Sequence, residues 1–174
     1  NHQKLIKFII YTTLGFVKLL QKLKKFSIIH THLKVILTIT EATPMKIAVI
    51  DGQGGKMGRL LIEKIKTAHP QTEITAIGTN SMATAAMLKA APTHAATGEN
   101  AVIVACRSAE IIIGPIGIAI ADSLFGEITP AMALAVGQSS ARKILIPISK
   151  CNNYVAGVED KSAAELIQAA VSAL

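Results

Sequence analysis

The sequence is short of cysteine, which excludes several classes of small protein. Its two cysteines, Cys106 and Cys151, form no CxxC pair and have no metal-site spacing to the five histidines. A disulfide framework and a zinc module are therefore excluded. We expect no bound metal, and two free thiols in a reducing cytosol.

Long apolar runs are missing from the N-terminal quarter. The longest uncharged run within residues 1–44 covers residues 8–17, well short of the ~20 residues that a membrane span needs. No small-residue cleavage site follows this run, as a secretory signal would require. We therefore expect no transmembrane span and a cytoplasmic location.

Acidic residues are scarce only in the first quarter of the chain. Residues 1–44 contain seven lysines and one acid, whereas residues 45–174 contain eleven basic and ten acidic residues. One folded unit seldom changes composition so sharply, so we expect residues 1–44 to be a basic apolar extension outside the native domain, which would open at Met45. The domain itself is almost neutral, and no nucleic-acid partner is expected for it. A surface-bound amphipathic helix is an alternative for the extension.

From residue 45 onward, apolar strand patterns alternate with helical patterns. We expect strands over residues 46–50, 73–78, 93–96, 111–114 and 143–148. The expected helices cover residues 55–68, 81–91, 118–125 and 129–137, with others starting at residue 98 and at a capping box at Ser162. Continuously apolar strands belong to a parallel sheet that is covered on both faces. Residues 154–158 follow the last strand too closely for a parallel crossover, so they predict an antiparallel edge strand. The fold class is a three-layer α/β sandwich of Rossmann or flavodoxin type.

The segment MKIAVIDGQGGKMGR, residues 45–59, is the most informative stretch of the chain. It reads as a strand, a glycine-rich turn and the start of a helix, the order found where nucleotide phosphates bind. The spacing from Gly54 to Gly58 is one residue longer than in the usual G-x-G-x-x-G pattern. Peptide N–H groups of the loop would converge on an anion. Asp51 would shape the turn, and the alternatives are a base or a ligand for a metal ion bound to phosphate. The loop residues predicted to bind the cofactor are Gly52, Gln53, Gly54, Gly55, Lys56, Met57 and Gly58.

Further candidates follow the other strands. Thr79 and Asn80 end the second strand, where NAD-binding proteins commonly have an acid that holds the ribose. Since that acid is absent, NADP, NAD and a mononucleotide all remain open. Gly114 and Pro115 end a central strand at the same sheet edge and could contact the ligand. Weaker candidates are residues 97–100, which also suit a helix cap, and Cys151, beside Lys150.

Two resemblances add to this interpretation. The pattern of residues 52–59 resembles the nicotinamide-cofactor loop of dihydrodipicolinate reductases, although the rest of the chain lacks their other motif and their second domain. A wider set of motifs, among them GTNSMATAAMLKA, IIIGPIGI and GEITPAMA, resembles a small bacterial family of uncharacterised proteins over residues 45–171. That family has a Rossmann-like domain of unknown function, so the resemblance implies a fold without an activity.

The sequence thus predicts a protein that binds a nucleotide or dinucleotide, of NAD(P) type, through residues 51–59. The alternative is a non-catalytic sensing or scaffold module that recognises a phosphorylated metabolite or a protein partner. No acid–base or nucleophile–base arrangement is evident, so the sequence assigns neither a catalytic residue nor a reaction. A homo-oligomer would provide room for a substrate between subunits.

Overall fold

The computed structural model describes residues 12–16, 18, 21–22, 43–148, 154–158 and 161–174, and it contains two separate units. The first, residues 1–43, is helical at each of its described positions before residue 23. The second, residues 44–174, holds the sheet and the candidate site. None of the described helices has both the length and the apolar character that crossing a membrane requires.

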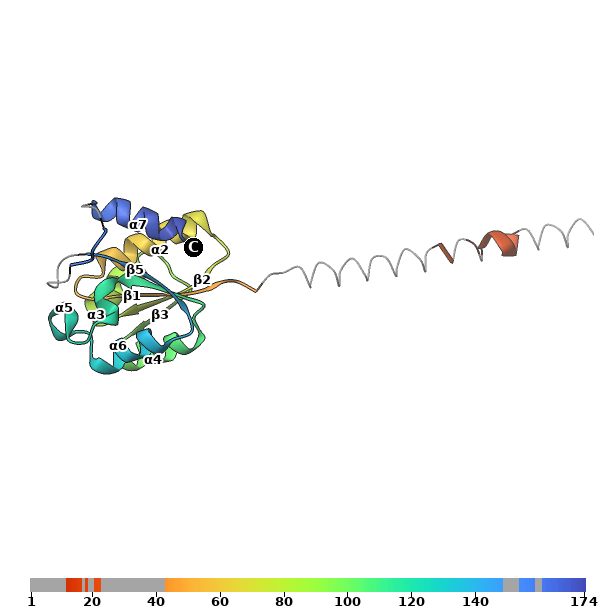
Figure 1. The fold of residues 1–174 in the computed structure, drawn as a ribbon. Helices are drawn as coiled ribbons and strands as arrows, with labels where there is room; N and C mark the ends of the chain where they lie inside the picture. Colours follow the sequence, from red (N-terminus) through yellow and green to blue (C-terminus); the bar gives the residue numbers. More distant parts are fainter. Residues whose placement is uncertain (1–11, 17, 19–20, 23–42, 149–153, 159–160) are drawn as a thin grey trace, which may run out of the picture. The chain divides into compact units, whose positions relative to one another are not determined.

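A five-stranded parallel sheet forms the centre of the second unit (Figure 1). Its strands are β1 (Lys46–Asp51), β2 (Glu73–Gly78), β3 (His94–Thr97), β4 (Ile111–Pro115) and β5 (Arg142–Ile146). The order β3-β2-β1-β4-β5 places β1 between β2 and β4, with Ile47 beside Ile74 on one side and Ile111 on the other. The carboxyl ends of β1, β2 and β4 therefore meet at one edge of the sheet, at the point where the strand order reverses.

Helices cover both faces of the sheet because the side chains of its strands alternate between faces. Ile47 and Val49 of β1 pack in one apolar cluster with α2 (Lys56–Ala68), α3 (Ser81–Leu88) and α7 (Ala163–Ser172). Ala48 and Ile50 pack in the other with α4 (Glu99–Ser108) and α6 (Pro130–Gln138). Figure 1 shows α2 and α7 on one side of the sheet and α4 and α6 on the opposite side. The three-layer α/β fold predicted from the sequence is confirmed.

Two predicted elements are wrong. Residues 154–158 contain a turn and no strand, so the sheet has no antiparallel edge strand there. The helix predicted over residues 118–125 is replaced by a short 3-10 helix, η1 (Ile116–Ala119), and a single turn, α5 (Ser123–Gly126). Leu124 and Phe125 have left-handed backbone angles, and the Asp122 N–H donates to the Ile128 carbonyl at 2.8 Å. The resulting loop buries Leu124 and Ile128 in the core.

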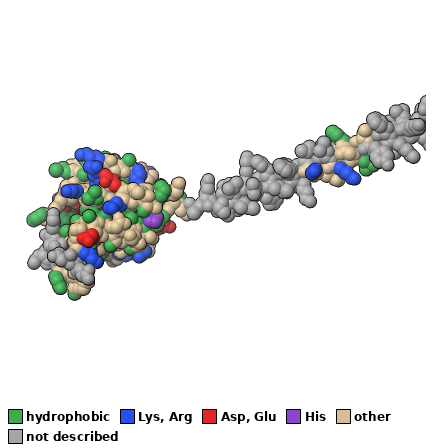
Figure 2. Space-filling model, turned by 90° about the horizontal axis from the view of Figure 1, so that it is seen from above, with side chains coloured by type: hydrophobic (Ala, Val, Ile, Leu, Met, Phe, Trp, Pro, Cys, Tyr) green, Lys and Arg blue, Asp and Glu red, His purple; other side chains and the backbone are tan. Residues whose placement is uncertain are grey.

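The surface of this unit carries both signs of charge. On the face seen in Figure 2, basic and acidic side chains are interspersed with apolar ones. This matches the near balance of basic and acidic residues over positions 45–174. The visible face therefore offers no large field of one sign that would steer a polyanion.

Candidate functional site

Asp51, the last residue of β1, organises the glycine-rich loop. Its side chain is buried, and its two oxygens accept the Gly52 N–H at 2.8 Å and the Gly58 N–H at 2.7 Å. Burial raises the pKa of the Asp51 carboxyl, against the opposing effect of hydrogen bonds from Gly58, Gly52 and Met57. The nearby Glu127 carboxylate raises that pKa further. Asp51 thus ties the start of the loop to the first turn of α2, the structural role expected for it.

The four glycines of the loop have different roles. A Cβ on Gly58 would overlap Met87 Sδ and lie 2.9 Å from Asp51 Cβ, so this glycine lets α2 approach the sheet. Gly55 has a φ of 64°, and a Cβ there would overlap the Ala83 carbonyl oxygen of α3. Gly52 is enclosed by Glu127, Thr79 and Leu124. A Cβ on Gly54 would meet nothing within 4 Å, so Gly54 alone of the four borders open space.

The sequence predicts that the peptide N–H groups of the loop are free to bind an anion, and this prediction is wrong for most of the loop. The N–H groups of Gly52 and Gly58 donate to Asp51, and that of Gly55 donates to the Gly52 carbonyl at 3.0 Å. The Gln53 N–H donates to Glu127 at 2.7 Å. Within the described part of the chain, the N–H groups of Gly54 and Lys56 have no acceptor. Gly54 and Lys56 are therefore the loop positions where peptide hydrogens remain open to a ligand.

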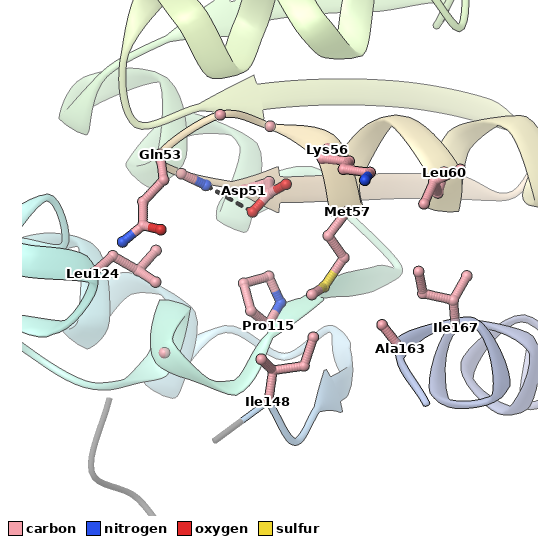
Figure 3. Close-up of a pocket in the computed structure, with 14 residues that line it drawn as sticks. Asp51, Gln53, Lys56, Met57, Leu60, Pro115, Leu124, Ile148, Ala163 and Ile167 are labelled. Atoms are coloured by element: carbon pink, nitrogen blue, oxygen red, sulfur yellow. Dashed lines mark hydrogen bonds between the residues drawn. The ribbon is translucent and has the colours of Figure 1, made fainter. Parts of the chain in front are cut away.

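A cavity of about 420 Å³ lies against the loop, between the carboxyl ends of β1 and β4 and the start of α7. Its polar wall consists of residues 51–57. Its apolar wall contains Leu60, Pro115, Leu124, Ile148, Ala163 and Ile167. Figure 3 shows Asp51, Gln53 and Met57 on the loop side, with Pro115 and Ile148 across the opening from them. Ligand pockets typically measure ~300–1,000 Å³ and combine apolar walls with a few polar groups.

Thr79 and Asn80 lie beside this cavity without lining it. Glu127 joins them to the loop, because its Oε2 accepts the Asn80 amide N–H at 2.9 Å, the Thr79 hydroxyl and the Gln53 N–H. Burial alone would raise the pKa of Glu127, but the hydrogen bonds from Gln53, Thr79 and Asn80 outweigh it and lower the pKa. Asn80 also caps α3 by accepting the Ala83 N–H at 2.8 Å.

The remaining candidates divide into three groups. Pro115 lines the cavity, whereas Gly114 is buried where a Cβ would overlap the Ile50 carbonyl oxygen. Glu99, in the first turn of α4, accepts the Thr129 hydroxyl at 2.5 Å, and the hydroxyls of Thr97 and Thr84 share a hydrogen bond at 2.6 Å; the N-cap of α4 is Gly98, without a side-chain cap. Cys106 is a free, buried cysteine. Burial raises the pKa of its thiol, and the positive charge of Lys143 opposes this effect. Residues 150–153, including Cys151, lie outside the described residues.

Several cavity residues were not among the sequence candidates. Leu60 lies in α2 shortly after the loop and Gly117 follows the end of β4, whereas the others come from segments far from both: Leu124, Ile148, Ala163 and Ile167. Glu127 was also missed, although it lies in the GEITP motif. In the sequence, the one signal that could have indicated Glu127 is an isolated acid within an otherwise uncharged stretch. Among the described residues, no group of three or more His, Cys, Asp or Glu side chains could hold a metal ion.

Comparison with known proteins identifies the family. The family model DUF3842, a domain of unknown function, matches residues 46–174. The chain belongs to this family. No curated protein matches it. The comparisons do not show the predicted likeness of the DUF3842 loop to dihydrodipicolinate reductases.

Two solved structures are similar in part. A nucleoside-diphosphate-sugar epimerase from Pseudomonas aeruginosa is 15% identical with a TM-score of 0.38, over 74% of this chain and 46% of the epimerase. An FMN-dependent Ubix-like decarboxylase from Escherichia coli, described as dodecameric, is 13% identical with a TM-score of 0.38, over 74% of this chain and 91% of its own. The chain thus spans less than half of the epimerase. At these scores neither likeness supports an argument about function.

Proposed function

We propose that the DUF3842 domain binds a nucleotide or dinucleotide, of NAD(P) type, in the cavity beside the glycine-rich loop. The observation that carries this proposal is the cavity of about 420 Å³ with one polar and one apolar wall, at the carboxyl edge of β1 and β4. Ligands of open α/β sheets bind beyond that edge, where the strand order reverses. A heterocyclic ring with an attached phosphate has the matching combination of an apolar face and an anionic group.

The ligand would contact each wall through a different part. Pro115, Leu124 and Ile167 provide the apolar surface for a ring. The unpaired N–H groups of Gly54 and Lys56 can donate to phosphate oxygens, and the Lys56 ammonium supplies a positive charge at the same wall. Peptide N–H groups at the start of a helix favour an anion through the helix dipole as well. Gly52, Gln53, Gly55 and Met57 complete that wall.

Binding without catalysis is the second candidate, and Asp51 favours it. Asp51 and Lys56 are the titratable side chains among the described residues that line the cavity. Both Asp51 oxygens already accept hydrogen bonds from peptide N–H groups, so the carboxylate has a structural role. A sensing module that recognises a phosphorylated metabolite needs a binding site but no catalytic residue. Turnover of a bound redox cofactor would instead favour an oxidoreductase.

Substitution of Gly54 by valine tests the proposal. The side chain would project into open space, so the fold should be kept while the loop-side wall is blocked. NAD, NADP, FMN, FAD and ATP would each be added to the full chain in a thermal-shift assay. A ligand at ~100 times its Kd stabilises the folded state by roughly 2.7 kcal/mol. We expect at least one nucleotide to stabilise the wild type and to lose that effect with Gly54→Val.

Gly137→Val provides a matched control. Gly137 lies in α6, away from the cavity lining, and a Cβ there also meets nothing within 4 Å. This variant should respond to nucleotides as the wild type does. If no nucleotide shifts the wild-type transition, the nucleotide-binding proposal is wrong and a scaffold role gains support. An undiminished shift with Gly54→Val would place the ligand outside this cavity.

A further inference from the structure

The Glu127 carboxylate accepts hydrogen bonds from several donors that belong to other segments of the chain. Its Oε2 accepts the peptide N–H of Gln53 at 2.7 Å, the side-chain amide of Asn80 at 2.9 Å and the Thr79 hydroxyl. Gln53 belongs to the glycine-rich loop, while Thr79 and Asn80 follow β2. Glu127 reaches them from the connection between α5 and α6. Three donors from two distant segments therefore converge on one carboxylate oxygen.

These donors form a subsite for an anion. A peptide N–H, a hydroxyl and an amide can hold an anionic oxygen without a basic side chain, and hydrogen bonds to a charged acceptor are stronger than neutral ones. The Glu127 oxygen occupies the position that an oxygen of a ligand phosphate would otherwise take. Gln53 also lines the cavity, so the subsite adjoins the space proposed for the nucleotide.

The Glu127 carboxylate already occupies the three donors. A Cβ on Gly52 would be 2.7 Å from Glu127 Oε2 and 2.9 Å from Leu124 Cδ1, which shows how closely this segment covers the loop. Oε2 is held by its three donors, whereas Oε1 has no hydrogen bond to a described residue. A fixed carboxylate with one open oxygen can accept a hydroxyl, and it repels a phosphate.

We propose that Glu127 determines ligand specificity by occupying this subsite: the site accepts a ligand with free ribose hydroxyls there and rejects one with a phosphate. Glu127 supplies, from a distant segment, the acid that is absent from the end of β2. The inference rests on the proposed nucleotide binding, and it selects the unphosphorylated ribose of NAD over the 2′-phosphate of NADP. Removing the carboxylate should open the same donors to an added anion.

Inorganic phosphate tests the subsite without any nucleotide. The Gln53 amide signal of the full chain would be followed by NMR during a phosphate titration at constant ionic strength. We expect a saturable shift in Glu127→Ala and none in the wild type. Glu73→Ala, at the opposite end of β2, removes the same charge and should behave as the wild type. A shift in the wild type equal to that of Glu127→Ala would refute the inference, as would no shift in Glu127→Ala.

Glu127→Gln keeps the side-chain shape and removes its charge, so it tests the effect of the carboxylate charge on nucleotide specificity; because its amide oxygen can still accept from the same donors, it should show no phosphate shift. Titration calorimetry with NAD and NADP then measures specificity. The wild type should bind NAD at least about tenfold more tightly than NADP, and Glu127→Gln should reduce that ratio by about tenfold, or about 1.4 kcal/mol. Equal wild-type affinities would refute the inference. If neither nucleotide binds, the proposed function fails, while the phosphate titration still decides whether the subsite exists.

Discussion

Replacing Gly58 by alanine tests how closely α2 is packed against the sheet at the site. The added Cβ would overlap Met87 Sδ and lie 2.9 Å from Asp51 Cβ, whereas carbon atoms in contact are normally ~3.5–4.0 Å apart. Met87 is fully buried, so its side chain cannot withdraw into solvent. Such overpacking costs ~1–3 kcal/mol, and the better helix propensity of alanine returns about 1 kcal/mol. We expect the free energy of unfolding to fall by up to roughly 2 kcal/mol, measured by urea denaturation with an unchanged slope.

A double mutant tests whether Met87 is the side chain that opposes a Cβ at position 58. Met87→Ala removes Met87 Sδ and Cγ, two of the three atoms nearest the new Cβ, at a cost of about 2–5 kcal/mol by itself. Asp51 Cβ remains, so in that background Gly58→Ala should destabilise less than in the wild type, by a coupling energy of ~0.5–3 kcal/mol. Gly137→Ala, in open space on α6, is the control and should stabilise slightly. Equal destabilisation in both backgrounds would show that Met87 is not what Gly58 accommodates, and a single variant stabilised by the full helix-propensity gain of about 1 kcal/mol would contradict the packing altogether.

Two further predictions concern α7 and Glu127. Ser162→Ala removes a capping box in which Ser162 Oγ accepts the Glu165 N–H at 3.3 Å and the Glu165 carboxylate accepts the Ser162 N–H at 2.9 Å. Urea denaturation should show that the free energy of unfolding falls by about 1 kcal/mol. An unchanged free energy of unfolding would mean that the cap does not stabilise α7. The pKa of Glu127 is lowered below its ordinary 4.5, so its stabilising contribution is present above pH 4.5 and is lost as the pH falls through the lowered value. The difference in Tm between wild type and Glu127→Gln should therefore be largest near neutral pH and shrink on acidification. A difference that is constant with pH would contradict a stabilising role for the ionised Glu127 carboxylate.

The sheet could be predicted from the sequence because its strands are apolar throughout. Every residue of Ile111–Pro115 is buried, and such a run fits only a strand covered on both faces. The helix predicted over residues 118–125 failed because periodicity does not report left-handed residues. Leu124 and Phe125 adopt that conformation although neither is glycine. Tertiary packing of Leu124 in the core overrides the local preference there.

The candidate site was predictable where it is local in sequence and, at Pro115, where the end of a strand marks the same edge of the sheet. The loop from Gly52 to Met57 follows directly from a strand, a glycine cluster and a helix start, and it does line the cavity. Glu127 lies 74 positions from Gln53 and 48 from Thr79, so no local pattern links them. The apolar wall from α7 is equally distant in sequence. Such contacts depend on the strand order, which periodicity alone does not determine.

Asp51 changes what the glycine pattern implies about the ligand. In a loop that depends on a phosphate, the N–H groups of Gly52 and Gly58 would await the ligand, but here the preceding acid already accepts both. The loop is thus formed around an anion of its own chain, and a phosphate placed close to Asp51 would meet a like charge. The N–H groups of Gly54 and Lys56 remain, together with a wall of apolar side chains. A ligand should therefore gain more affinity from a ring packed on that wall than from its phosphate, the reverse of what the glycine spacing alone suggests.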